Sequence, residues 1–119
     1  MRLALLAVLL AGCVTASIPI PPPSASEMTF AVEVQTGTAR FSYRPTARFA
    51  NSVVYVFNRT VGTGIIATAR DDGSVGPTEP FPAALGQDVQ ITFDTGETAV
   101  SNCVVVREGT PNAAESCRD

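Results

Sequence analysis

The stretch VQITF at residues 89–93 decides the fold of this 119-residue chain. Val89, Ile91 and Phe93 alternate with Gln90 and Thr92. A period of two is typical of a strand that places one face on a core and the other in solvent. The stretch therefore predicts a β-strand whose three apolar side chains enter a hydrophobic core.

The same alternation occurs in two neighbouring runs closer to the N-terminus. One run carries Phe30, Val32 and Val34 at alternate positions, and the other carries Ala39, Phe41 and Tyr43. The dipeptide Thr36-Gly37 between them is a turn signal. We expect a β-hairpin whose six alternating apolar side chains face the core.

The middle of the chain predicts further strands and no helix. The run VVYVF at residues 53–57 is apolar at every position, which is typical of a central strand covered on both faces. We expect further strands at residues 65–69, after the Asp-Asp-Gly-Ser turn of residues 71–74, and at residues 101–108. Prolines at 77, 80 and 82 restrict the segment after that turn to an edge or irregular strand. The prediction is an all-β fold, a single β-sandwich of about seven strands.

Four motifs between residues 53 and 93 add a family resemblance. They are VVYVFNRT, TGIIATA, DDGSV and PAALGQDVQI, in that order. Together they resemble bacterial Ig-like and carboxypeptidase-regulatory-like domains, although Val75 stands where an aromatic residue is common and Gln87 splits a Gly-Asp pair. The resemblance implies an Ig-like or transthyretin-like sandwich that acts as a spacer, an adhesive unit or an interaction domain, and it carries no catalytic residues.

The N-terminal sequence MRLALLAVLLAGC has the features of an export signal. Arg2 precedes an unbroken apolar run that is too short to span a bilayer, and small residues precede Cys13. Residues 10–13, LAGC, resemble the lipobox of bacterial lipoproteins. That resemblance implies that Cys13 becomes the first mature residue and carries acyl chains, and Val14 then implies the outer membrane if the source is Gram-negative.

These features predict three parts of the chain. Residues 1–12 are a lipoprotein signal peptide, residues 13–26 are the lipidated cysteine with a proline-rich tether, and residues 27–119 are the sandwich domain. A competing interpretation stays open. Val14-Thr15-Ala16 also fits an ordinary signal peptidase site, and cleavage after Ala16 would release a soluble secreted or periplasmic ligand-binding or inhibitory domain.

Composition narrows the chemistry. After Cys13 the chain holds eleven acidic and seven basic residues, a net charge of −4, which disfavours nucleic acid as a partner. Histidine and lysine are absent, so Ser-His-Asp, Cys-His and Ser-Lys catalysis are excluded. The remaining acid pairs, Asp71 with Asp72 and Asp94 with Glu97, suit turns better than catalysis. We expect no catalytic residues, no metal, no cofactor and no enzymatic activity.

Two further groups of residues stand out. Cys103 and Cys117 predict a disulfide that ties the C-terminal tail to the last strand. Arg40, Arg44, Arg48 and Arg59 form a candidate patch for an anionic ligand such as an envelope polymer. We expect a monomer held at the membrane by its lipid anchor, which acts as a structural or interaction module toward an envelope polymer or protein.

Overall fold

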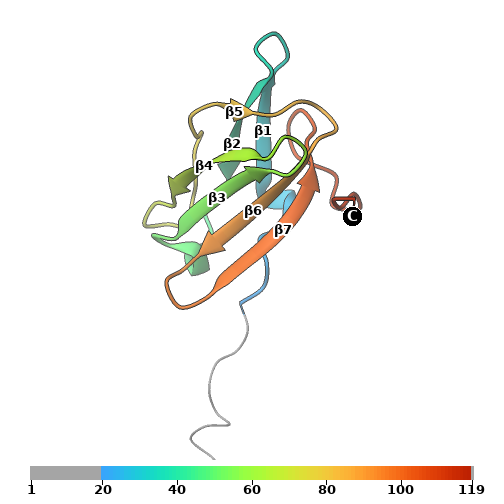
Figure 1. The fold of residues 1–119 in the computed structure, drawn as a ribbon. Helices are drawn as coiled ribbons and strands as arrows, with labels where there is room; N and C mark the ends of the chain where they lie inside the picture. The colour runs from blue at the N-terminus through green and yellow to red at the C-terminus, as the bar shows by residue number, and fades with distance from the viewer. Residues whose placement is uncertain (1–19, 119) are drawn as a thin grey trace, which may run out of the picture.

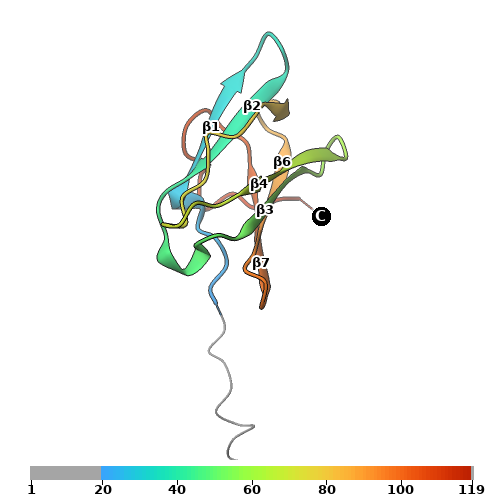
Figure 2. The same cartoon turned by 90° about the vertical axis from the view of Figure 1, so that its left-hand side faces the viewer.

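Two antiparallel sheets pack face to face in the computed structural model, which describes residues 20–118 (Figures 1 and 2). One sheet has the order β1-β2-β5, with β1 at Met28–Glu33, β2 at Thr38–Tyr43 and β5 at Phe81–Pro82. The other has the order β4-β3-β6-β7, with β3 at Val53–Asn58, β4 at Thr63–Thr68, β6 at Asp88–Asp94 and β7 at Ala99–Val105. Two short 3-10 helices, η1 at Ala25–Glu27 and η2 at Ala47–Phe49, complete the elements. The predicted all-β sandwich of seven strands is confirmed.

Strand β6 behaves as its alternation predicted. Val89, Ile91 and Phe93 are fully buried, and β6 is hydrogen-bonded to β3 on one side and to β7 on the other. Phe93 stacks on Phe49 of η2, with 4.2 Å between ring centroids. Tyr43 meets both rings from the opposite sheet, at centroid distances of 4.9 and 5.9 Å. These aromatic side chains join the two layers through one core.

The predicted hairpin forms between β1 and β2, with Phe30 opposite Phe41. Ala39, Phe41 and Tyr43 are buried as expected. The prediction for Val34 is wrong: β1 ends at Glu33, and Val34 is 77% exposed in the turn. The hairpin extends past the sheet that faces it, so its tip has no partner layer to bury an apolar side chain (Figure 1).

The expectation that β3 is covered on both faces is also wrong. Val54 and Val56 point into the core and are fully buried, whereas Val53, Tyr55 and Phe57 are 37%, 39% and 43% exposed. No element among residues 20–118 packs over the outer face of the four-stranded sheet. β-branched and aromatic side chains favour a strand wherever they stand, so an apolar run does not by itself show how many layers cover it.

The proline-bearing segment after Val75 follows its prediction. Val75 makes an isolated bridge to Tyr43, and β5 contains only two residues at the edge of the smaller sheet. Thr78 is buried beside β2, and its side-chain hydroxyl accepts a hydrogen bond from Phe41 N at 3.0 Å, where a neighbouring strand would offer a backbone carbonyl. Proline cannot donate to a ladder, so the segment pairs through single residues.

The described end of the proline-rich segment packs on the sandwich. Pro23 and Ala25 are buried. Ser24 N donates to the Tyr43 hydroxyl, and Asn102 Nδ2 donates to Pro23 O, each at 3.0 Å. The folded part of the chain thus includes residues that precede the expected boundary at residue 27. Cys13 and the predicted signal peptide lie outside the described residues.

Candidate functional site

Three connections meet at the end of the sandwich opposite the point where the described chain begins (Figure 1). They are residues 34–37, 59–62 and 83–87, and we call this end the distal end. Ala83 N donates to Gly37 O at 3.0 Å, and Asp88 N donates to Thr60 Oγ1 at 2.9 Å. Hydrogen bonds between connections that are far apart in the sequence give this end a defined shape.

Asn58, the last residue of β3, organises the distal end from inside. Its side chain is fully buried, and Nδ2 donates to Pro82 O and to Gln87 Oε1, both at 2.9 Å. Its Oδ1 accepts from Thr60 N at 2.9 Å and from Val61 N at 3.3 Å. The amide thus satisfies all its hydrogen-bonding capacity by joining two strands and two loops. Gln87 completes this network because its Oε1 also accepts from Ala84 N at 2.9 Å.

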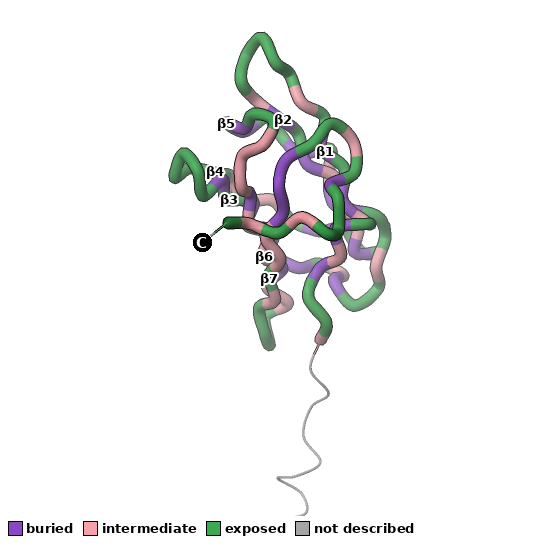
Figure 3. Tube along the Cα trace, turned by 90° about the vertical axis from the view of Figure 1, so that its right-hand side faces the viewer, coloured by how far each residue is buried: buried purple, intermediate pink, exposed green. Residues whose placement is uncertain are grey.

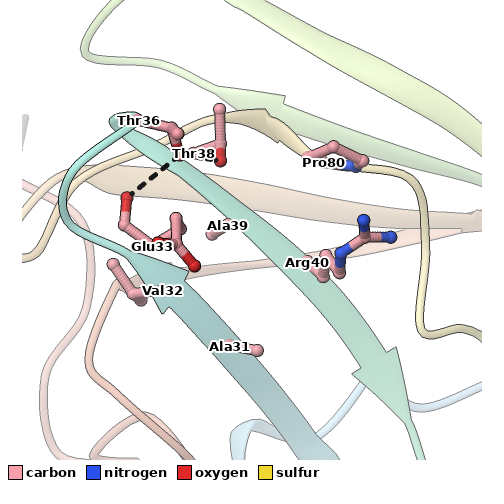
Figure 4. Close-up of a pocket in the computed structure, with 8 residues that line it drawn as sticks. All are labelled: Ala31, Val32, Glu33, Thr36, Thr38, Ala39, Arg40 and Pro80. Atoms are coloured by element: carbon pink, nitrogen blue, oxygen red, sulfur yellow. Dashed lines mark hydrogen bonds between the residues drawn. The ribbon is translucent and has the colours of Figure 1, made fainter.

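A hollow of about 320 Å³ lies on the outer face of β1 and β2 (Figure 4). Glu33 supplies a carboxylate to it, Arg40 supplies a guanidinium, and Thr36 and Thr38 add hydroxyl groups. Arg40 is held in place by donating from Nη1 to Thr78 O at 3.0 Å. The hollow can therefore offer both signs of charge to a polar ligand.

A second hollow, of about 230 Å³, lies between the β1–β2 hairpin and the loop that precedes β6. It is lined mainly by apolar residues, with Val34 and Leu85 at 77% and 52% exposure. The two hollows share Val32 and Glu33. We call the two hollows together the hairpin site. Figure 3 shows that the tip of the β1–β2 hairpin is exposed.

The structure does not bring the four predicted arginines together. Arg40 faces outward from β2, and Arg44, just past the end of β2, lies 3.5 Å from Glu27. Arg48 stacks over Phe49 with its guanidinium carbon 4.6 Å from the ring centroid. Arg59 follows β3 in the other sheet and approaches Cys103 Sγ at 3.6 Å. Arg40 alone belongs to the hairpin site.

The predicted acid pairs lie in turns. Asp72 Oδ1 accepts from Ser74 Oγ at 2.6 Å and from Ser74 N at 2.9 Å, and Asp94 Oδ1 accepts from Gly96 N at 2.9 Å. The hydroxyl hydrogen bond, followed by the backbone one, holds the pKa of the Asp72 carboxyl below its ordinary value. These are the local bonds by which aspartates define turns.

Cys103 and Cys117 form the predicted disulfide, with 5.4 Å between their Cα atoms. The tail it holds is also paired through Arg107, whose Nη2 lies 2.8 Å from Glu115 Oε2. Arg118 N reaches Asp88 Oδ2 at 3.3 Å. The disulfide thus fixes the tail against β7 and the start of β6.

Sequence reasoning did not single out Glu33, Val34 or Leu85 as site residues. A usable signal existed: the apolar residue Val34 lies three positions before the turn glycine Gly37, and Leu85 directly precedes Gly86. Apolar side chains beside a tight turn stand where the chain leaves the sheet, and such positions frequently project into solvent.

No protein family, curated protein or solved structure matches this chain in the comparisons. The resemblance to Ig-like domains and to lipoproteins therefore stays a prediction. Within residues 20–118, no group of three cysteine, aspartate or glutamate side chains is arranged to hold a metal ion. None of the helices in that range has the length and apolar character needed to cross a membrane.

Proposed function

We propose that this protein is a lipid-anchored, non-enzymatic interaction module of the bacterial envelope, and that it binds its partner through the hairpin site. The export signal and the lipobox-like LAGC at residues 10–13 support the location. The hairpin site supports the mode of action, because one of its hollows is lined mainly by apolar side chains and the other offers one carboxylate and one guanidinium. Such a mixture suits recognition of a polymer or protein segment.

The position of the hairpin site carries the proposal. The described chain begins at one end of the sandwich, and the connections that carry the exposed residues Val34 and Leu85 lie at the other end (Figure 1). If Cys13 is acylated, the segment from there to Pro22 spans up to about 30 Å as an extended proline-rich tether. This arrangement would hold the hairpin site away from the membrane surface.

The partner class follows from the chemistry of the site. Val34 and Leu85 need an apolar group to cover them, whereas Glu33 and Arg40 favour a ligand with polar or charged groups nearby. An extended peptide segment of an envelope protein meets both needs. An envelope polymer without apolar groups would leave the side chains of Val34 and Leu85 exposed to water.

The first experiment tests the site in the cell. A photo-cross-linking amino acid replaces Leu85 in the full chain, and the matched control carries it at Glu97, an exposed position in the turn at the opposite end. We expect a discrete cross-linked product from position 85 and none from position 97. Equal labelling at both positions, or none at either, would overturn the hairpin site as the binding surface.

A second experiment tests the anchor separately. Intact mass spectrometry of the mature protein should show an N-terminus at Cys13 with added acyl chains. A soluble species that begins at Ser17 would contradict the lipid anchor and favour the alternative, a released ligand-binding domain. The cross-linking result is read independently of this one.

A further inference from the structure

Three of the four sheet edges in the sandwich are either covered by other parts of the chain or too short to pair. Phe30 of β1 exchanges two hydrogen bonds with Gly109, at 2.8 and 2.9 Å. On β7, Asn102 bonds Pro23 and Cys103 is tied to the tail. β5 is two residues long and contains proline. Blocked edges prevent pairing with other chains.

Strand β4 is the remaining edge, and it is open. Among the strands of residues 20–118 it is hydrogen-bonded only to β3, although it also lies close to β5 of the other sheet. Its sequence TGIIAT carries no charge and no proline, and Ile66 is 65% exposed. A neutral, proline-free edge with an exposed isoleucine is a template for pairing with another strand.

The ladder between β3 and β4 shows which backbone groups are free. Ala69 N donates to Ser52 O at 2.8 Å, so these two opposite residues form a hydrogen-bonded pair. Along an antiparallel ladder, hydrogen-bonded pairs of opposite residues alternate with pairs that are not hydrogen-bonded. The register pairs Val54 with Ala67 and Val56 with Ile65, which places both pairs in the bonded phase. The N–H and C=O groups of Gly64, Ile66 and Thr68 therefore point away from β3.

We propose that β4 pairs antiparallel with β4 of a second copy of this chain, about a two-fold axis at Ile66. In that register Ile66 faces Ile66 of the second copy, and Gly64 faces Thr68 in both directions. All three outward residues of each strand then form bonded pairs, which is the self-complementarity that a two-fold dimer requires. The four-stranded sheets of the two copies would then form one continuous sheet of eight strands.

Two details favour a second copy as the occupant. The hollow of about 200 Å³ beside Gly64, lined also by Tyr55 and Phe57, would receive the branched side chain of Thr68 from the other copy. An antiparallel arrangement also places the acidic turn Asp71-Asp72 beside the turn before β4, which carries Arg59, and away from its own equivalent. The proposal replaces the expectation of a monomer.

Disulfide trapping in the full chain tests the register. Ile66→Cys places two thiols at the axis, where bonded antiparallel pairs have Cα atoms about 5.5 Å apart, within disulfide range. Thr68→Cys is the matched control on the same face, since its two thiols would be about 14 Å apart. We expect a reducible band of doubled mass at least about tenfold stronger for Ile66→Cys than for Thr68→Cys or the unmodified chain.

A measurement without cysteine substitution keeps the test independent of folding defects. Amide hydrogen exchange of the unmodified chain should slow with rising protein concentration at Gly64, Ile66 and Thr68, whereas Ile65 and Ala67 stay protected at every concentration. Ile66→Lys should abolish the concentration dependence. Equal cross-linking at both positions, no cross-link at Ile66→Cys, or exchange at Ile66 that ignores concentration would each overturn the dimer.

Discussion

At the scale of single residues, Asn58 shows how a buried polar group shapes a loop end. Its amide is fully buried and makes four hydrogen bonds, which join its own strand β3 to strand β5 and to two loops. Burying an amide without partners is costly, so its position is strongly specified. Asn58 also opens the sequon-like triplet Asn58-Arg59-Thr60, and its complete burial assigns it to structure rather than to modification.

We predict that Asn58→Ala lowers the free energy of unfolding by about 2 to 3 kcal/mol, because it leaves buried donors and acceptors without partners. Urea denaturation followed by circular dichroism measures the loss. The control is Asn112→Ala, an exposed asparagine that accepts one hydrogen bond from Ala114 N, and it should cost less than about 1 kcal/mol. Similar losses for the two variants would contradict the assigned role of Asn58.

Asp72 gives a prediction on pH. Because the pKa of its carboxyl is lowered in the folded state, the ionised form is favoured by folding. Its contribution to stability is thus present at neutral pH and is lost as the pH falls through the lowered pKa. We predict that Ser74→Ala raises the pKa of Asp72 toward its ordinary value, as measured by NMR titration of the side-chain carboxyl carbon. Ser101→Ala, which removes a hydroxyl bonded to Thr92, should leave that pKa unchanged.

At the scale of elements, β7 and the tail behave as one unit closed by a disulfide. Thirteen residues lie between Cys103 and Cys117, and several backbone and side-chain bonds connect the enclosed loop to the sheet. Gly109, within this loop, bridges to β1 in the other sheet. The tail therefore helps to join the two layers and to block two sheet edges.

We predict that the double variant Cys103→Ser and Cys117→Ser lowers the free energy of unfolding by about 3 kcal/mol, as expected for a loop of this length. Amide exchange in residues 109–118 should accelerate, while the amides of β3 lose protection only to the extent of the global loss. Ser116→Ala serves as the control, because it changes the tail without opening the disulfide. A tail that keeps its protection in the double variant would show that other bonds hold it.

At the scale of the whole molecule, the sandwich is organised by the aromatic contact between its layers. Phe93 and Phe49 stack within the core, and Tyr43 reaches them from the other sheet. The outer face of the four-stranded sheet bears further apolar side chains, including Tyr55 and Phe57. Identical residue types therefore have different roles on the two faces of one sheet.

A comparison of two phenylalanines tests this description. We predict that Phe93→Ala lowers the free energy of unfolding by about 3 to 5 kcal/mol, because it leaves a cavity in the core. Phe57→Ala, on the adjacent strand but 43% exposed, should cost less than about 1.5 kcal/mol. Both losses come from the same chemical denaturation experiment. A large loss at Phe57 would mean that its face is covered.

Much of the fold could be predicted from local patterns. The alternation in β6 and β2 identified which side chains enter the core, since strand geometry alone sets a period of two. The prolines near β5 indicated an edge strand, and the spacing of Cys103 and Cys117 indicated a closed tail. Each inference depended only on residues close together in the sequence.

The hairpin site could not be predicted in the same way. It unites Glu33 and Val34 with Leu85, some fifty residues later, and the candidate arginine patch failed to converge because Arg59 belongs to the other sheet. Which distant residues come together depends on the order of the strands in each sheet, and the same pattern of apolar residues is compatible with several strand orders. No local signal distinguishes among them.

The sequence by itself determined that this chain forms β-strands separated by turns, and which side chains of most strands point inward. These properties depend on backbone geometry and side-chain sterics, which act between residues that are close together in the sequence. Only the tertiary structure decided which face of β3 is left exposed, which sheet edges are blocked, and which loops meet at the distal end. Those properties depend on which distant segment packs beside each strand, and that is set by the free energy of the whole core.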